Sequence, residues 1–160
     1  KSKAELLRAK INKKAGVTTA YNLNQENPTK VKDWIPTGSS WLDRIICKGK
    51  VAGIPSGRIT DLCGLFSAGK SYMAIQIAAN ALKKGYSVVY FDSENAIDPK
   101  FIEKMGIDLE DFIYVQAKDV EFVFETIEEL LSDTESPILF VWDSIAQTPT
   151  RPDLLHTGAY

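Results

Sequence analysis

A glycine-bounded loop is the part of the sequence whose residue types and spacing most directly indicate chemistry. Residues 64–71 read GLFSAGKS and fit the pattern GxxxxGK[ST] without deviation. Glycine lets the backbone approach dense negative charge closely and turn several N–H groups inward. The helix expected to begin near Gly69 points the positive end of its dipole at the same place. This pattern predicts a loop that holds the phosphates of ATP.

Two side chains of this loop have individual roles in the prediction. Lys70 adds a full positive charge near the β- and γ-phosphates and is also a predicted catalytic residue. The hydroxyl of Ser71 is placed to coordinate Mg²⁺, so ATP and Mg²⁺ are the expected cofactors. The predicted nucleotide-binding segment comprises Gly64, Leu65, Phe66, Ser67, Ala68, Gly69, Lys70, Ser71 and Tyr72.

Two carboxylates follow apolar runs that are typical of buried parallel strands. Asp143 comes directly after ILFVW, and a carboxylate at that end of a strand faces the ligand crevice. It is predicted to hold Mg²⁺, usually through water. Glu94 follows the run VVYF after Asp92 and Ser93, where a carboxylate can orient and deprotonate the attacking water. For Glu94, the residues alone do not decide between this role and that of a solvated loop residue.

These residues need a scaffold, and the apolar patterns indicate strands that alternate with helices. This order predicts an α/β domain with a mainly parallel sheet. The loop would connect a strand to a helix, as its motif requires. Strands are expected at 58–63, 86–91, 112–116 and 137–142, and helices at 3–14, from 37–40 onward, at 70–84, 99–105 and around 120–131.

The two ends of the chain differ from this regular centre. Residues 1–33 are predicted to form a short helix and a polar linker, and a lone helix of this kind often docks on its own domain or on a neighbour. Residues 34–146 are the predicted core. Residues 147–160 contain two prolines and no clear period, so we expect an irregular tail. Four strands make a small sheet, and the chain is therefore expected to be part of a longer protein.

Composition limits the class of protein without indicating a partner. Of the 160 residues, 44% are hydrophobic and 25% are charged, and the formal net charge is −2. This composition is globular, and no apolar run approaches the roughly 20 residues that span a membrane. Cys47 and Cys63 lack CxxC spacing, which favours a reducing cytosolic setting. The lone His156 lies in the tail and is expected to be neither catalytic nor a metal ligand.

Charge is unevenly distributed along the chain. Residues 1–14 are basic and residues 119–135 are acidic. Two interpretations stay open: both segments are solvated helix faces, or the two complementary ends help subunits to associate.

The sequence segments around these motifs resemble the RecA recombinase family, and most closely its phage UvsX-type members. The matching segments are PTGSSWLDRIICKGKVAGIPSGRITDLCGLFSAGKS at 36–71, VVYFDSENAIDPKFIEKMGIDLEDF at 88–112 and ILFVWDSIA at 138–146. With the helices between them, they cover most of the chain from Trp34 to Thr148. The order, the spacing and the local sequence of these segments all agree with the family, so the resemblance does not depend on the phosphate loop alone.

The resemblance implies roles for individual residues. Glu94, in the DSE that replaces the bacterial DAE, matches the catalytic glutamate, and Asp143 matches the Mg²⁺ aspartate. Ser144 follows Asp143 as expected and belongs to the predicted binding residues. Asp98 matches the residue that contacts the adenine amino group. Phe101 takes the place of the aromatic residue, usually tyrosine, that stacks on adenine, and it keeps the π-face.

The function that the resemblance implies is ATP-dependent homologous recombination. The family's fold is a P-loop NTPase core, whose C-terminal part would be missing here. The expected activity is a DNA-dependent ATPase that forms filaments on single-stranded DNA and exchanges strands with duplex DNA. The resemblance implies that residues 1–33 act as an oligomerisation arm, whose helix would pack on the adjacent protomer. A loading mediator and a single-strand binding protein stay open as further partners, no membrane partner is expected, and the expected location is the cytoplasm of a bacterial or phage-infected cell.

The sequence also departs from the family in ways that keep alternatives open. The family binds DNA through two mobile loops after the strand that ends at Asp143, and the sequence ends about where the first would begin. DNA contacts are therefore expected mostly beyond this chain. A hexameric helicase with the same core is one alternative, although the word DSENAIDP argues against it. The other is a regulatory ATP-binding module that oligomerises without acting on DNA.

Overall fold

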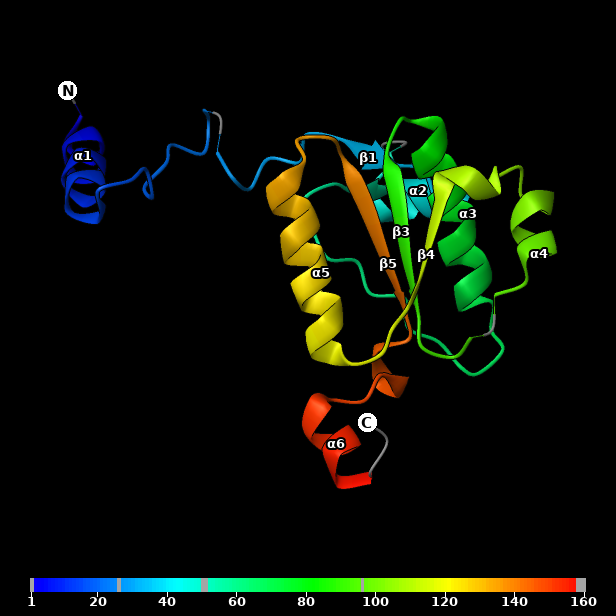
Figure 1. The fold of residues 1–160 in the computed structure, drawn as a ribbon. Coiled ribbons are helices and arrows are strands. Elements are labelled where there is room, and N and C mark those ends of the chain that lie inside the picture. The colour runs from blue at the N-terminus through cyan, green and yellow to red at the C-terminus, as the bar shows by residue number, and fades with distance from the viewer. Residues whose placement is uncertain (1, 26, 50–51, 96, 158–160) are drawn as a thin grey trace. The chain divides into compact units, whose positions relative to one another are not determined.

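A computed structural model describes residues 2–25, 27–49, 52–95 and 97–157 (Figure 1). The chain divides into two compact units, Lys1–Asp33 and Trp34–Tyr160. In the first unit, α1 spans Lys3–Ala15 and confirms the predicted N-terminal helix. Ser2 and Glu5 cap its first turn reciprocally, and Gly16 ends it with a left-handed φ of 72°. No described residue of α1 is buried.

The centre of the second unit is a parallel sheet of three strands in the order β4-β3-β5. These strands are β3 (Ser87–Asp92), β4 (Phe112–Gln116) and β5 (Ile138–Asp143). The central strand β3 is buried from Val88 to Asp92, as its continuous apolar run predicts. A separate antiparallel pair joins β1 (Trp34–Ile35) to β2 (Ile54–Pro55).

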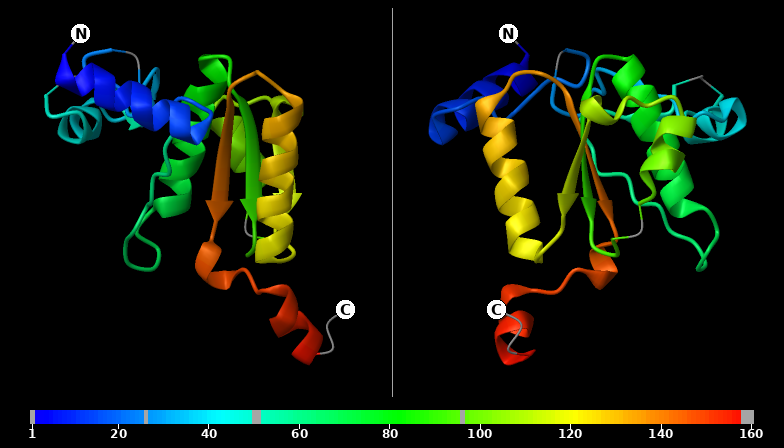
Figure 2. Two further views of the ribbon diagram at one scale, coloured as in Figure 1. Left: turned by 90° about the vertical axis from the view of Figure 1, so that its left-hand side faces the viewer. Right: turned by 45° about the vertical axis from the view of Figure 1, so that its right-hand side comes forward.

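Helices cover both faces of this sheet, and the left view of Figure 2 shows it edge on between α3 and α5. Side chains of β3 alternate between the faces. Val88 and Tyr90 join a core cluster with α3 (Lys70–Lys83) and α4 (Pro99–Lys104). Val89 and Phe91 join a second cluster with α5 (Val120–Asp133). The expected alternation of helices and parallel strands is thus confirmed. The remaining elements before β4 are α2 (Ser40–Ile46) and the 3₁₀ turn η1 (Leu109–Asp111).

The strand expected at 58–63 is wrong, so the sheet has three parallel strands instead of four. Residues 58–63 form no strand, and the side chain of Ile59 is 99% exposed. Half of the segment is polar (Arg58, Thr60 and Asp61), so it lacks the continuous apolar run of β3. A strand buried on both faces needs such a run, and burial of Ile59 would need a layer that the described residues do not supply.

The expected irregular tail also differs from the structure, because η2 spans Ile145–Gln147 and α6 spans Arg151–Thr157. Figure 1 shows α6 beyond the carboxyl end of β5. Thr150 and Asp153 bind each other's backbone N–H groups, which caps the first turn of α6. The guanidinium of Arg151 binds both carboxylate oxygens of Glu125 on α5, at 2.8 and 2.7 Å. The sequence TRPD at 150–153 is a capping pattern and could have predicted this helix.

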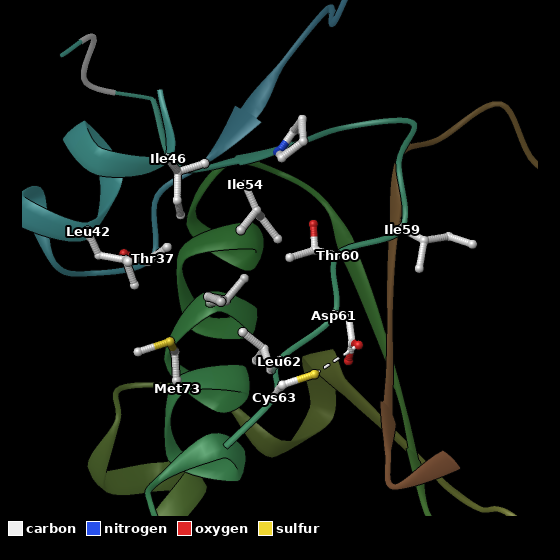
Figure 3. Close-up of a pocket in the computed structure, with 12 residues that line it drawn as sticks. Thr37, Leu42, Ile46, Ile54, Ile59, Thr60, Asp61, Leu62, Cys63 and Met73 are labelled. Carbon is white, nitrogen blue, oxygen red and sulfur yellow. Dashed lines mark hydrogen bonds between the residues drawn. The ribbon is translucent and has the colours of Figure 1, made fainter. Parts of the chain in front are cut away.

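An apolar pocket of about 490 Å³ lies between α2, α3 and the segment 59–63 (Figure 3). Leu42, Ile54, Leu62 and Met73 are among its lining residues. At its edge, the thiol of Cys63 donates to Asp61 Oδ2 at 3.0 Å, and this hydrogen bond raises the pKa of the thiol. None of the residues predicted to bind nucleotide lines this pocket.

Neither cysteine forms a disulfide: Cys47 is buried and free, and Cys63 is exposed and free. Among the helices of the described residues, none has both the length and the apolar character that crossing a membrane requires.

Candidate nucleotide-binding site

The candidate site lies at the carboxyl edge of the sheet, where parallel strands present their final residues together. The register of β3 and β5 places Asp92 opposite Asp143, and both residues end their strands. The loop that precedes α3 lies at the same end of the sheet, as Figure 2 shows. The fold therefore brings the predicted phosphate loop and the predicted metal aspartate to one edge.

The loop at 64–69 is exposed and tightly turned. The N–H of Ala68 donates to the carbonyl of Leu65 at 3.2 Å, and Ser67 has a positive φ of 57°. Gly69 precedes α3 with a φ of 91°, a conformation that an L side chain would strain. Helix α3 then begins at Lys70, so its amino terminus faces the loop.

The ammonium group of Lys70 lies against the loop itself. Its Nζ donates to the carbonyl oxygens of Gly64 at 3.2 Å and Leu65 at 3.1 Å. Two backbone acceptors thus hold a full positive charge beside the exposed turn. A phosphate group bound in this loop would be a stronger acceptor for Lys70 than these neutral carbonyls.

A cavity of about 310 Å³ brings together six predicted site residues, which come from α3, the loop after β3, α4 and β5. They are Ser71, Tyr72, Glu94, Asp98, Phe101 and Asp143. Its other lining residues are Ile75, Tyr90, Asp92 and Ile97. Residues 64–70 and Ser144 do not line this cavity, although the segment 64–70 directly precedes Ser71 and Ser144 directly follows Asp143.

Two aromatic rings form the part of the cavity suited to a flat ligand. The rings of Tyr72 and Phe101 are tilted by 49° with centroids 5.5 Å apart. Asp98 caps α4 by accepting the N–H of Lys100 at 3.0 Å, and this cap starts the helix that carries Phe101. A planar base could pack against these rings while Asp98 presents a carboxylate nearby.

Asp92 orders the loop that carries Glu94, and sequence reasoning gave it no role. Its side chain is 2% exposed. Its Oδ1 accepts the N–H of Glu94 at 2.9 Å, and its Oδ2 accepts the N–H of Ile97 and the hydroxyl of Tyr114, both at 3.3 Å. Burial and the neighbouring charge of Asp92 raise the pKa of Tyr114. A carboxylate at the end of an apolar strand was the available signal for this role.

Asp143 is held from β3 by Tyr90, a second residue that the sequence did not single out. The Tyr90 hydroxyl donates to Asp143 Oδ2 at 2.8 Å. Burial raises the pKa of Tyr90 far above its usual range, and this hydrogen bond is the second largest cause, so the hydroxyl remains protonated. The only polar atom in the side chains of the run VVYF belongs to this tyrosine, which was the signal available in the sequence.

Ser144 lies just beyond the cavity and joins the ends of β5 and β3. Its N–H donates to Ser93 Oγ at 2.8 Å, and the hydroxyl of Ser93 donates back to the carbonyl of Ser144 at 2.9 Å. Ser144 therefore positions its neighbour Asp143 relative to the loop that carries Glu94.

The residues at this site fit a magnesium ion that is bound together with phosphate. Within the described ranges, no group of three or more histidine, cysteine, aspartate or glutamate side chains could hold a metal alone. Ser71 and Asp143 supply a hydroxyl and a carboxylate to the same cavity. Mg²⁺ prefers oxygen ligands and commonly uses one or two protein groups, with substrate phosphates and water completing its shell.

Comparison with known proteins decides the family. Residues 3–154 match the RecA N-terminal domain. The chain belongs to the RecA family. Among its relatives, Protein RecA of Aquifex aeolicus is 35% identical over 154 residues, which cover 96% of this chain and 43% of that protein. Protein RecA of Aquifex pyrophilus is 36% identical over 150 residues, covering 94% and 42%.

A third relative is named as a DNA repair protein. The mitochondrial DNA repair protein recA homolog of Dictyostelium discoideum is 31% identical over 144 residues, which cover 90% of this chain and 31% of that protein. The family expected from the sequence is thus confirmed. The chain spans less than half the length of these RecA-family relatives.

Proposed function

We propose that this RecA-family chain forms the Mg-ATP site of a DNA-dependent ATPase that acts in homologous recombination. The observation that carries the proposal is the cavity in which Ser71, Glu94, Asp98, Phe101 and Asp143 converge. These residues come from four separate segments of the chain, and the sequence motifs and the family resemblance predict a nucleotide or metal role for each of them. A chance convergence of hydroxyl, carboxylate and aromatic groups next to an anion-binding loop is a weaker explanation.

Each group has a distinct task in the proposed P-loop site. The backbone of 64–69 and the ammonium of Lys70 hold the phosphates, and Ser71 with Asp143 holds Mg²⁺. When bound, Mg²⁺ supplies positive charge that offsets the charge on the β- and γ-phosphates. The rings of Tyr72 and Phe101 bind the base, whose amino group Asp98 recognises. Ser144 keeps the end of β5 in register with β3.

Glu94 is the proposed catalytic base. Its side chain is exposed on the cavity, and its backbone is held by the buried Asp92. Glu94 orients a water molecule against the γ-phosphate and accepts its proton, and Lys70 offsets the negative charge that develops during transfer.

The biological setting is proposed from the relatives. Two are named Protein RecA and a third is named a mitochondrial DNA repair protein. By analogy, the whole protein forms filaments on single-stranded DNA, pairs it with duplex DNA and binds DNA mostly through regions beyond this chain. Helix α1 is its arm toward the next protomer. The DSE at 92–94 favours a phage UvsX-type member, with mediator and single-strand binding partners in the cytoplasm.

Phosphate release by the full-length protein, with and without single-stranded DNA, tests this function. The proposal expects hydrolysis that single-stranded DNA stimulates, together with joint-molecule formation between that strand and a homologous duplex. A hexameric helicase would unwind a forked duplex instead. A regulatory module would bind ATP without stimulation by DNA, and either result would contradict the proposal.

A further inference from the structure

Tyr90 is a polar-tipped side chain in the middle of the hydrophobic core. It is 0% exposed, and its ring packs in the cluster between β3, α3 and α4. Its ring centroid lies 5.5 Å from that of Phe112 on β4, with an interplanar angle of 34°. Phenylalanine would satisfy this packing equally well, so the hydroxyl needs a separate explanation.

The register of the sheet explains where the hydroxyl reaches. Tyr90 lies opposite Val141 on β5, and Asp143 is two residues further along the same strand. Residues two apart on a strand share one face of the sheet, so Tyr90 and Asp143 lie on the same face. The length of the phenol ring spans the remaining separation and brings its hydroxyl to 2.8 Å from Asp143 Oδ2.

We propose that Tyr90 is a positioning residue that orients the Asp143 carboxylate for Mg²⁺ bound with the nucleotide. This inference rests on the proposed function and adds to it a residue that acts through Asp143. The hydroxyl donates to Oδ2 and limits the rotation of the carboxylate, so Oδ1 is the oxygen that would be left for the hydrated ion. Outer-shell hydrogen bonds of this kind orient metal ligands and strengthen metal binding in other sites.

Packing around the ring of Tyr90 holds its hydroxyl in place beside Asp143. The ring is enclosed by core residues of α3 and β4, so it cannot change rotamer without opening the core. A donor placed in this way costs little ordering entropy when the ion binds. Tyr90 thus connects the packed core to the metal site without touching the ion itself.

A Mg²⁺ titration of nucleotide binding tests this role without measuring hydrolysis. The full chain is titrated with a fluorescent ATP analogue at increasing Mg²⁺, and in excess chelator without Mg²⁺. Tyr90→Phe should raise the Mg²⁺ concentration for half-maximal binding by about tenfold. Its affinity for the analogue without Mg²⁺ should stay within twofold of wild type. An unchanged or lower Mg²⁺ requirement would overturn the proposal.

Two further variants separate this inference from the proposed function. Tyr114→Phe removes a hydroxyl that contacts Asp92 and Asn95 instead of Asp143, and it should leave the Mg²⁺ requirement within twofold. Asp143→Asn should raise the requirement at least as much as Tyr90→Phe. If Asp143→Asn raises it and Tyr90→Phe does not, the role of Tyr90 alone fails. If neither variant raises it, the metal assignment of Asp143 fails, and the role of Tyr90 fails with it.

A purely structural role for the hydroxyl predicts a different pattern. Tyr90→Phe would then weaken analogue binding equally with and without Mg²⁺ and lower the thermal midpoint in chelator, which would also overturn the proposal. If the variant does not fold, fluorotyrosine can be incorporated into the wild-type chain. Among the described tyrosines, the ¹⁹F signal most protected from a soluble paramagnet reports Tyr90, which is 0% exposed. The others are exposed (Tyr21, Tyr72 and Tyr114) or only partly buried (Tyr86). The Tyr90 signal should shift when Mg²⁺ is added to the nucleotide complex, and an unshifted signal would contradict the role.

Discussion

The backbone N–H of Glu94 donates to the buried carboxylate of Asp92 at 2.9 Å. Asp92 ends the central strand, so this hydrogen bond attaches the proposed catalytic base to the most buried element of the fold. The second oxygen of Asp92 accepts the N–H of Ile97, which begins the approach to α4. One buried aspartate therefore sets the course of the loop that carries both Glu94 and Asp98.

Asp92→Ala should destabilise the chain because it leaves the N–H groups of Glu94 and Ile97 without their acceptor. A hydrogen bond to a charged group contributes about 1.5–3 kcal/mol, so the loss of these two part-buried bonds should lower the free energy of unfolding by at least about 2 kcal/mol. Urea unfolding measures it. Asp108→Ala is the matched control, because exposed Asp108 caps one N–H, that of Glu110, and should cost about 1 kcal/mol. Equal losses in the two variants would contradict the role given to Asp92.

Lys70→Ala should lower nucleotide affinity because the loop loses its full positive charge. A charge-assisted hydrogen bond contributes about 1.5–3 kcal/mol, which corresponds to roughly a 10- to 100-fold weaker complex. Titration with a fluorescent ATP analogue in saturating Mg²⁺ measures the change. Lys83→Ala, at the far end of α3, removes the same charge away from the loop and should bind like wild type. Wild-type affinity in Lys70→Ala would remove this lysine from the phosphate site.

Helix α6 should lose its attachment as the pH falls. Hydrogen bonds from Arg151 lower the pKa of Glu125, and hydrogen bonds from Thr150 lower that of Asp153. A lowered folded-state pKa gives stability that is complete above the unfolded value and is lost as pH falls through the folded value. Amide exchange protection in α6 should therefore be constant from pH 7 to 5 and decrease below about pH 4, once intrinsic rates are corrected.

Variants on α5 identify the carboxylate responsible. Glu125→Gln should lower the protection of α6 at pH 6 and reduce its dependence on acid. Glu128→Gln removes a carboxylate from an exposed position on the same helix and should change neither. If protection of α6 persists unchanged down to pH 3, the ion pair between Arg151 and Glu125 does not hold this helix.

The elements that the sequence predicted well are those with a strong local pattern. The run VVYF at 88–91 is apolar on both faces and became the central strand. Helix α3 follows a glycine turn and ends next to Gly85, and both boundaries were visible in the sequence. The motif spacing also selected Ser71, Glu94 and Asp143, because strand ends at one sheet edge must converge. The roles of Asp98 and Phe101 came from the resemblance to the RecA family.

The elements that were missed depend on contacts between distant segments. Whether Arg58–Cys63 forms a strand depends on a neighbouring strand and a covering layer, neither of which a half-polar segment specifies by itself. Helix α6 is attached through Arg151, which contacts Asp119, Glu121 and Glu125, all at least 26 residues earlier in the chain. The roles of Asp92 and Tyr90 arise from hydrogen bonds to other segments of the chain. The register that brings Tyr90 to Asp143 cannot be predicted from the sequence of β3 or of β5 alone.

Substitution of Glu94 by glutamine should separate ATP binding from ATP hydrolysis. Glutamine keeps the size of the side chain and removes the basic carboxylate. In the proposed site, the phosphates are held by Lys70, the loop and Mg²⁺, so the affinity of the variant for ATP should stay within about threefold of wild type. Hydrolysis should fall by roughly 10²–10⁴-fold, the usual contribution of a general base. Glu103→Gln, at an exposed position on α4, is the matched control and should hydrolyse ATP normally.

Both quantities can be measured on one preparation of the full-length protein, by nucleotide titration and by phosphate release with single-stranded DNA present. We expect the Glu94→Gln protein to bind ATP, to release almost no phosphate and to form filaments on DNA that persist longer than those of wild type. Phosphate release by Glu94→Gln at the wild-type rate would contradict the role of Glu94 as the catalytic base, even if the phosphate loop still bound ATP.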